Sequence, residues 1–389
     1  MAGPGRSWRH WDAPGDGADH ITVLPPELRA RIAASLPFRQ VAQLATLSRP
    51  WRHIHRHTPV VELKLDEWGS AAGVLDEDAL ACLELALLRR GQEGSGSRVG
   101  TLRVTFAVED PRMRRHAGLI IALADARRIR ITVPGFGGFP QVEWSVDLSP
   151  AAVDLEVEAV CHLTPAIAGP GAAALQKLCL DTVVVPEWPS LPSLRHLALH
   201  NVTVLAPFPD AARCPRLEHM CILECLIELA CVHIRLPLLR SLRMDKAYGA
   251  PCATIDAPEL EELDVNCGAG FAAADYQSFS LRAPRLRCLT WSEQFAERVH
   301  IDVGRPGSVT SGRIKYTWKR GLVSCREMED LRAQMTRMLE RLLPELSPEG
   351  VADAARPYIS LDKYTMEDPY SGSENVGGEY LQNGLTPQQ

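Results

Sequence analysis

A motif with apolar residues at its first, fourth and sixth positions recurs ten times, and it constrains the fold more than any other feature of the sequence. Most motifs begin 21 to 27 residues after the previous one, with extremes of 19 and 39. A repeat of this length is one supersecondary unit that must stack on its neighbours to bury its apolar side. We therefore expect one strand per repeat, stacked in parallel. The motifs are Val60-Leu63-Leu65, Val99-Leu102-Val104, Ala126-Ile129-Ile131, Ala152-Leu155-Val157, Leu175-Leu178-Leu180, Leu194-Leu197-Leu199, Leu217-Met220-Ile222, Leu239-Leu242-Met244, Leu260-Leu263-Val265 and Leu286-Leu289-Trp291.

A proline at a fixed offset supports this interpretation. It lies two residues before each of the last five motifs, at Pro192, Pro215, Pro237, Pro258 and Pro284. Proline cannot continue a helix and forces the preceding residue into an extended conformation, so it would end one return segment and start the next strand. Independent strands of a β-sandwich, the competing interpretation, do not explain a proline at one offset.

The spacing is typical of leucine-rich repeats and predicts an α/β (α+β) solenoid. We expect helices in the early repeats, over residues 76–90, with Leu80, Leu83 and Leu87 as the buried stripe, and over residues 111–125. The later repeats are expected to return by short irregular loops. In leucine-rich repeats an Asn or Cys usually lies three residues after the sixth motif position. Here only Cys225 fits that pattern, so we expect an irregularly curved array. The corresponding residues elsewhere are Val183, Val202, Ala247 and Gly268.

The pattern divides the chain into five parts. Residues 1–19 and 362–389 are predicted to be a flexible arm and tail, because they are polar and lack an apolar period. Residues 20–58 form a compact helical unit and residues 59–305 the repeats. Residues 306–361 are predicted to hold a final strand at Ile314, Tyr316 and Trp318 and an amphipathic helix that ends at Pro344. This helix would cap the array, although its apolar stripe also suits a partner.

Composition limits the classes of partner and the compartment. The formal net charge is −6 over 389 residues, which favours neither nucleic acid nor an anionic membrane. No apolar run approaches the roughly 20 residues of a membrane span. The eleven cysteines are scattered and odd in number, as expected of reduced thiols. These features predict a soluble protein of the cytoplasm or nucleus.

The segment from Leu24 to His55 resembles an F-box, with its opening Leu-Pro-x-Glu-Leu, a central Leu-Pro and a late Trp. Together with the repeats it resembles the plant F-box/leucine-rich-repeat family. The resemblance implies a three-helix F-box, an irregular repeat array and a C-terminal capping helix. It also implies the substrate-recognition subunit of an SCF-type E3 ubiquitin ligase, in which the F-box docks on a Skp-type adaptor that leads to a cullin and a RING subunit.

The resemblance assigns residues to the adaptor-binding surface. Trp51 would pack inside the F-box, and a three-helix unit this small has more apolar residues than it can bury alone. Pro50, Arg29 and Arg31 depart from the family pattern and could shift or weaken the docking. The residues implied for the adaptor are Leu24, Pro25, Glu27, Leu28, Ile32, Leu36, Pro37, Val41 and Leu44.

The residues between the apolar motif positions point to the other face of each strand, which we predict binds the client protein. Two acidic patches on the fourth and ninth strands flank a mixed centre, so a basic client segment would complement them. Plain solvated strand faces are the alternative. The predicted client-binding residues are Asp154, Glu156, Glu158, His196, His200, Arg243, Glu262 and Asp264.

No catalytic constellation stands out, and we predict a non-enzyme without a cofactor or metal. His53, His55 and His57 alternate, but a helix would splay them. Cys214, Cys221, Cys225 and Cys231 include no CxxC pair and are expected to be buried thiols. Two alternatives outside a ligase remain open: a repeat-protein scaffold and a small-molecule co-receptor.

Overall fold

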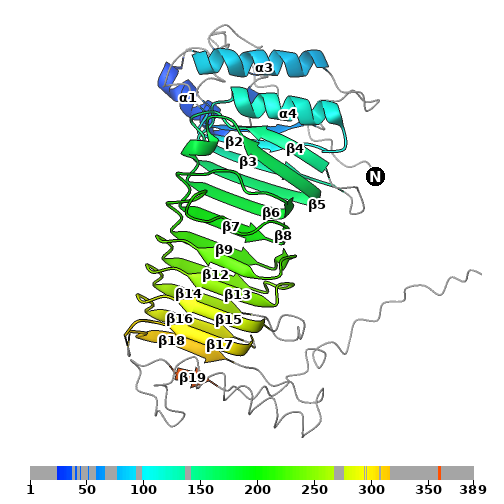
Figure 1. Cartoon of the computed structure of the whole chain (residues 1–389). Helices are drawn as coiled ribbons and strands as arrows, with labels where there is room; N and C mark the ends of the chain where they lie inside the picture. The colour runs from blue at the N-terminus through cyan, green and yellow to red at the C-terminus, as the bar shows by residue number, and fades with distance from the viewer. Residues whose placement is uncertain are drawn as a thin grey trace, which may run out of the picture. The chain divides into compact units, whose positions relative to one another are not determined.

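The computed structural model describes residues 24–36, 40–41, 44, 51, 58–65, 77–92, 99–135, 142–266, 276–292, 294, 296–305, 308–315 and 358–360. The chain forms two compact units, Met1–Leu194 and Arg195–Gln389. Both units contain stacked parallel strands (Figure 1). The predicted arm, tail and capping helix lie outside the described residues, as do Tyr316 and Trp318 of the predicted final strand.

The first unit contains a parallel sheet whose strands follow in the order β1, β2, β3, β5, β6. Strand β4 pairs with the second half of β5, from Leu163 to Ala168. The strands are β1 (Val60–Lys64), β2 (Thr101–Thr105), β3 (Arg128–Val133), β4 (Val142–Asp147), β5 (Asp154–Ala168) and β6 (Lys177–Val185). A short 3-10 helix, η5 (Ala172–Ala174), precedes β6.

Two helices occupy the first unit where the sequence predicts them, α3 (Glu77–Gln92) and α4 (Pro111–Leu123). Helix α4 begins at a proline, and the carboxylate of Asp110 accepts a hydrogen bond of 2.8 Å from the Arg112 amide. The helices pack together through the His116 Nδ1–Glu84 Oε1 contact of 2.7 Å. Leu80, Leu83 and Leu87 are buried, which confirms the predicted stripe on α3.

The second unit contains two parallel sheets. The first follows the order β7, β9, β12, β14, β16, β18, β19, and the second follows β11, β13, β15, β17. A short parallel pair, β8 and β10, lies beside them. The strands of the second unit are β7 (His196–His200), β8 (Thr203–Val204), β9 (His219–Leu223), β10 (Leu226–Ile227), β11 (Val232–Arg235), β12 (Ser241–Asp245), β13 (Cys252–Asp256), β14 (Glu262–Asn266), β15 (Tyr276–Arg282), β16 (Cys288–Ser292), β17 (Ala296–Asp302), β18 (Ser311–Lys315) and β19 (Tyr358–Ser360).

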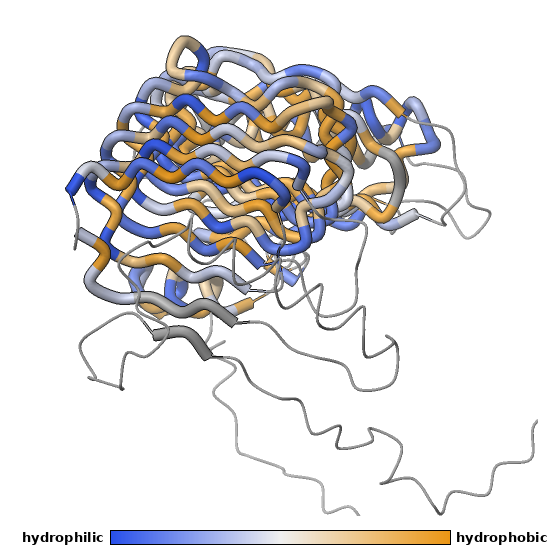
Figure 2. Tube along the Cα trace, turned by 60° about the horizontal axis from the view of Figure 1, so that its bottom comes forward, coloured by the Kyte–Doolittle hydropathy of each residue, from blue (hydrophilic) through white to orange (hydrophobic). Residues whose placement is uncertain are grey.

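The apolar motif forms the core of both units. All residues of the second to tenth motifs are at most 2% exposed, and polar residues alternate with them along the coils (Figure 2). The first motif is shifted by two residues from its prediction, because Val61 pairs with Leu102 and Leu63 with Val104. A shift of two keeps every side chain on its face of the sheet, since the side-chain period of a strand is two.

A β-turn with proline as its second residue precedes the strand in six repeats. Its closing amide, at the first motif position, donates to the carbonyl three residues earlier over 3.0–3.3 Å. Proline favours this position because its fixed φ matches types I and II turns. The prolines are Pro150, Pro192, Pro215, Pro237, Pro258 and Pro284, so the turn also occurs before the fourth motif, whereas Ala173 replaces the proline before the fifth.

The return segments of the later repeats differ from the prediction. We expected short irregular loops, but four of them form the parallel strands of the second sheet, β11, β13, β15 and β17. Alternating buried residues such as Val232 and Ile234, or Phe279 and Leu281, explain the difference. An apolar residue at every second position has a buried face only if the segment is extended and paired.

The position usually held by Asn in leucine-rich repeats is apolar and buried here. Val183, Val202 and Ala247 are 2%, 0% and 6% exposed. Among the described residues at this position, Cys225 keeps a polar role, because its thiol donates to the Leu199 carbonyl over 3.5 Å and to the Leu223 carbonyl over 3.3 Å. Apolar packing therefore replaces an amide ladder at this position.

Candidate functional site

The first candidate surface lies on helix α1 (Pro26–Ser35), the first helix of the predicted F-box. Pro26 occupies its first position, where the missing amide hydrogen costs nothing, and Glu27 lies beside the positive end of the helix dipole. The Pro25 carbonyl accepts from the amides of Leu28 and Arg29 over 3.1 Å each. The other two predicted helices lie mostly outside the described residues.

One side of α1 belongs to a small core. Ala33 is fully buried with Val41 and Trp51, and Leu36 and Leu44 pack partly against them. Trp51 therefore lies inside this unit, where the resemblance placed it. Val41 has no exposed surface, so it can shape an adaptor-binding surface but cannot touch a partner directly.

The other side of α1 carries apolar side chains that the unit leaves exposed. Leu28 is 43% exposed and Ile32 is 37% exposed, and a spacing of four residues puts them on one face of the helix. Pro25 and Glu27 are also exposed, and Leu24 is half-buried. The described part of the predicted adaptor surface thus divides into an exposed group and an internal group, while Pro37 lies outside the described residues.

The second candidate surface is the strand face, by which we mean the outward side chains of the first sheet in each unit. In the first unit the register aligns Asp154 with Arg128 and Lys177, and Glu156 with Arg130 and Cys179. Arg130 contacts Glu156 at 2.6 Å and 2.8 Å, and Lys177 lies 4.0 Å from Asp154. Two of the three predicted acids on β5 are therefore paired with cations of neighbouring strands.

Along β1, β2, β3, β5 and β6 the strand face of the first unit is balanced in charge. The described outward side chains of these five strands include five cations and five carboxylates, so the predicted acidic character of β5 is offset. Glu158 and Asp181 are register neighbours at its end, and the Asp181 carboxylate accepts a 2.9 Å hydrogen bond from the Thr182 hydroxyl. The cations are Lys64, Arg103, Arg128, Arg130 and Lys177, and the carboxylates are Glu62, Asp154, Glu156, Glu158 and Asp181.

The strand face of the second unit is more acidic. Arg243 on β12 lies between two carboxylates, 3.4 Å from Asp245 and 3.5 Å from Asp264. Glu262 adds a third carboxylate, 3.5 Å from the Ser241 hydroxyl. Asn266 donates to Asp245 over 2.9 Å. Arg243 is the one Lys or Arg among the described outward side chains of β7, β9, β12, β14 and β16, so three carboxylates share one cation there.

Burial modifies the acidity of groups on this face. Partial burial raises the pKa of Asp264 above its ordinary value, and the nearby Arg243 guanidinium lowers it in part. Burial also raises the pKa of the Cys221 thiol, and the Arg243 guanidinium again lowers that pKa in part. Both groups lie beside Arg243, so the guanidinium is the main source of positive potential in this cluster.

Two histidines stack at the start of the strand face in the second unit. The rings of His196 and His219 are parallel within 3°, with centroids 4.7 Å apart. The prediction included His196 and missed His219, although the 23-residue spacing of the two repeats assigns both to one position. His200 lies two residues further along β7, half-buried beside Leu223 of the next strand.

Metal chemistry finds no support in the described residues. No group of three or more His, Cys, Asp or Glu side chains there could hold a metal ion. Cys214 and Cys225 are buried as predicted, whereas Cys221 and Cys231 are only half-buried. His53, His55 and His57 lie outside the described residues. None of the helices described here is both long and apolar enough to cross a membrane.

Residues 166–304 match a family model of the leucine-rich repeats of the FBD-associated F-box protein At5g56370. The match includes the last six motifs, the five proline turns from Pro192 to Pro284 and the second sheet. No curated protein gives a significant match to the chain. The similarity over these repeats confirms the resemblance to plant-type F-box/leucine-rich-repeat proteins.

Proposed function

We propose that the chain is the substrate-recognition subunit of an SCF-type E3 ubiquitin ligase. In this proposal the N-terminal unit docks on a Skp-type adaptor, and the strand face of the repeats binds the client protein. Ubiquitin transfer belongs to the cullin and RING partners, and the chain itself contributes binding rather than catalysis. The match of its repeats to those of an F-box protein supports this role.

The exposed Leu28 and Ile32 are the observation that carries the proposal. They lie outside the core of Ala33, Val41 and Trp51, on a helix whose buried side is already occupied. Two large aliphatic side chains on one helix face are typical of a helix that packs into an apolar groove of a partner. Only 43% of Leu28 and 37% of Ile32 is still exposed, so removing that surface from water would stabilise the complex by about 1 kcal/mol for each side chain.

The proposal is tested by placing negative charges on this apolar face. Leu28→Asp combined with Ile32→Asp should weaken binding to a Skp-type adaptor by about 10²–10³-fold. The variant loses about 2 kcal/mol of apolar burial and also places two carboxylates against an apolar groove, and 1.4 kcal/mol corresponds to a factor of ten. Leu238→Asp is the matched control, since Leu238 is 45% exposed in a turn of the repeats. Isothermal titration calorimetry gives the affinities, and circular dichroism checks that each variant is folded.

Undiminished binding by the double variant would show that another surface contacts the adaptor. Failure of the unaltered protein to bind any Skp-type adaptor would favour a repeat-protein scaffold that acts outside a ligase.

The second unit suggests the chemistry of the client. Asp245, Glu262 and Asp264 outnumber Arg243, the one Lys or Arg among the described outward side chains of β7, β9, β12, β14 and β16, so a client segment rich in Lys or Arg suits this strand face. The balanced face of the first unit offers no comparable attraction. We therefore assign the basic-client preference to β12 and β14.

A labelled peptide of alternating lysine and glycine serves as the probe for this preference. Glu262→Gln with Asp264→Asn should weaken its binding about tenfold at low ionic strength, and added salt should reduce the difference. Glu143→Gln with Asp147→Asn removes the same charge from exposed positions of β4 and should have little effect. Equal losses in both double variants would indicate attraction to net charge alone.

A further inference from the structure

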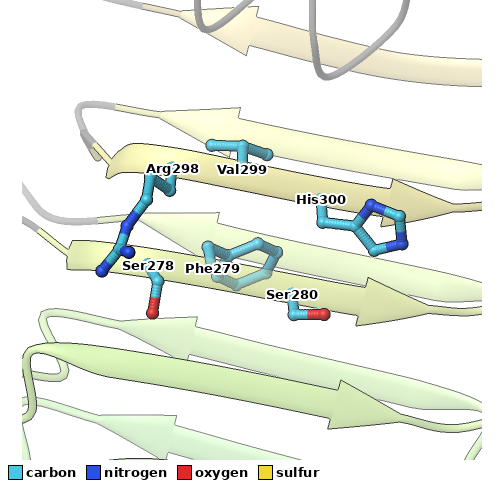
Figure 3. A pocket seen from close by; sticks show the side chains of 6 residues that line it. All are labelled: Ser278, Phe279, Ser280, Arg298, Val299 and His300. Carbon is cyan, nitrogen blue, oxygen red and sulfur yellow. The ribbon is translucent and has the colours of Figure 1, made fainter.

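A shallow hollow of about 330 Å³ lies on the second sheet of the second unit, at strands β15 and β17. Its lining residues are Ser278, Phe279, Ser280, Arg298, Val299 and His300 (Figure 3). The hollow belongs to the sheet made of return segments, and not to the first sheet that carries the strand face.

The register of the two strands brings four polar side chains together. Ser278 pairs with Arg298 and Ser280 pairs with His300, so two hydroxyls, a guanidinium and an imidazole occupy one side of the sheet. Arg298 extends towards Ser278, while Ser280 and His300 lie at the other end of the hollow (Figure 3).

The floor of the hollow is firmly packed. Phe279 lies between the two serines along β15 and is 1% exposed. Its ring meets Trp291 edge to face at a centroid distance of 4.9 Å and Tyr276 at 5.8 Å. The serines are therefore held on a strand whose inward side chain is fixed by aromatic neighbours, which reduces the entropy lost when a ligand binds.

The four polar side chains keep their hydrogen-bonding capacity. In the described part of the chain, Ser278, Ser280, Arg298 and His300 make no side-chain hydrogen bond or ion pair. This distinguishes Arg298 from Arg282 on the neighbouring strand β15, which lies 3.8 Å from Asp256.

The acids near the hollow are engaged elsewhere. Asp256 is paired with Arg282, and the Asp302 carboxylate accepts a 2.9 Å hydrogen bond from the Gly304 amide. Glu297 on β17 also has an interaction of its own. Among the described residues no carboxylate lines the hollow, although the chain as a whole has a net charge of −6.

We propose that this hollow is a binding site for a phosphate monoester. The planar guanidinium of Arg298 matches two phosphate oxygens at once, and the hydroxyls of Ser278 and Ser280 can donate to the remaining oxygens. The imidazole of His300 supplies a ring N–H at the opposite end. The same chemistry accepts a free phosphorylated small molecule or a phosphorylated side chain of a peptide.

The site goes beyond the proposed ligase role and does not depend on it. It uses no residue of α1 and no residue of the strand face. Failure of the chain to bind an adaptor would therefore not argue against this site. Failure to bind phosphate would likewise not argue against the ligase role.

The test uses the full chain and three probes at constant ionic strength: inorganic phosphate, a short phosphoserine peptide and the same peptide without phosphate. ³¹P NMR and calorimetry should detect saturable binding of a phosphorylated probe, and the plain peptide should not bind. Tighter binding of the phosphopeptide than of phosphate identifies a protein side chain as the source. Equal affinity identifies the free ion. Both results support the site.

Variants of the lining distinguish a built site from general attraction. Arg298→Gln should weaken binding of the better probe at least about tenfold, and Ser278→Ala about two- to fivefold, because charged hydrogen bonds are the stronger ones. Arg235→Gln is the matched control, since Arg235 is an exposed cation on β11 of the same sheet. Absence of saturable binding, or equal effects of Arg298→Gln and Arg235→Gln, would overturn the proposal.

Discussion

At the scale of single residues, a strained position recurs in four consecutive repeats, within β6 and directly after β7, β9 and β12. Thr182, Asn201, Glu224 and Lys246 have φ values of 54°, 52°, 55° and 50°. Each residue comes one place before a buried residue of the next turn. The left-handed region is unfavourable for residues with a Cβ atom, and least so for Asn. The backbone therefore adopts the left-handed conformation at this position whichever of these residues occupies it.

Thr182 carries the greatest strain of this set, because it is β-branched. Thr182→Asn should increase the free energy of unfolding by about 1 kcal/mol, and Asn201→Thr should decrease it by a similar amount. Chemical denaturation of both variants measures the two changes, and each is the control for the other. Changes of the same sign would mean that the backbone at these positions does not decide stability.

The thiol of Cys179 provides a test of pH dependence. Burial, followed by the negative Glu156, raises the pKa of Cys179 from 9.0 to about 11. The folded protein thus holds this proton more tightly than the unfolded chain, so stability should fall as the pH rises between about 9 and 11. A Cys179→Ser variant should lack this part of the decline.

Iodoacetamide gives a direct measurement of the same thiol. The alkylation rate of Cys179 in the folded protein should still be rising above pH 9, since the thiolate is the reactive form. Glu156→Gln should shift the profile to lower pH. A rate that levels off near pH 9 in the unaltered protein would contradict a raised pKa.

At the scale of elements, the second sheet is the main feature that the sequence pattern did not predict. Its strands return the chain between motifs, and their register places Val232 beside Ala253. Cys231 and Cys252 come one residue earlier and are therefore direct neighbours. The Cys231 thiol also lies 3.9 Å from the Thr254 hydroxyl. The position of these thiols depends on the sheet and offers a test of it.

A mild thiol oxidant should join Cys231 and Cys252 in the folded protein. Neighbours in a parallel sheet lie about 4.8 Å apart, within the Cα separation of disulfides. Mass spectrometry should find the loss of two hydrogens and a cross-link between these residues, and either Cys→Ser variant should prevent it. The bridge should raise stability by about 3 kcal/mol, as expected for a loop of roughly 20 residues.

Cys221 is the control for this cross-link. It is half-buried like Cys231, but its neighbours in the register are Ala198 and Arg243. It should remain a free thiol under the same treatment. Irregular return loops, as first expected, would leave Cys231 and Cys252 no more prone to pair than Cys221.

The repeats could be predicted because their signal is local and periodic. Nine of the ten motifs were placed correctly, α3 was found from its apolar stripe and charged ends, and α4 lies within the predicted range 111–125. The second sheet was missed because a pair such as Val232 and Ile234 is too short to separate a strand from a loop. The pairing of Glu156 with Arg130 was also missed, since it depends on the register between strands.

At the scale of the whole molecule, the proposed function assigns two tasks to different residues. In this proposal the exposed aliphatic face of α1 binds the adaptor, and the acidic strand face of β12 and β14 binds a basic client. These surfaces share no side chain, so changes to one should leave binding at the other unaltered. The Leu28→Asp and Ile32→Asp double variant should therefore keep its affinity for the lysine–glycine peptide. Loss of both activities together would indicate unfolding.

Hydrogen–deuterium exchange of the full chain, with and without a Skp-type adaptor, tests the central claim most directly. The amides of α1, residues 26–35, should exchange more slowly in the complex, because docking excludes water and suppresses local opening of this short helix. The amides of the strand face should be unchanged. Protection of the repeats with no protection of α1, or no change anywhere at saturating adaptor, would contradict the account.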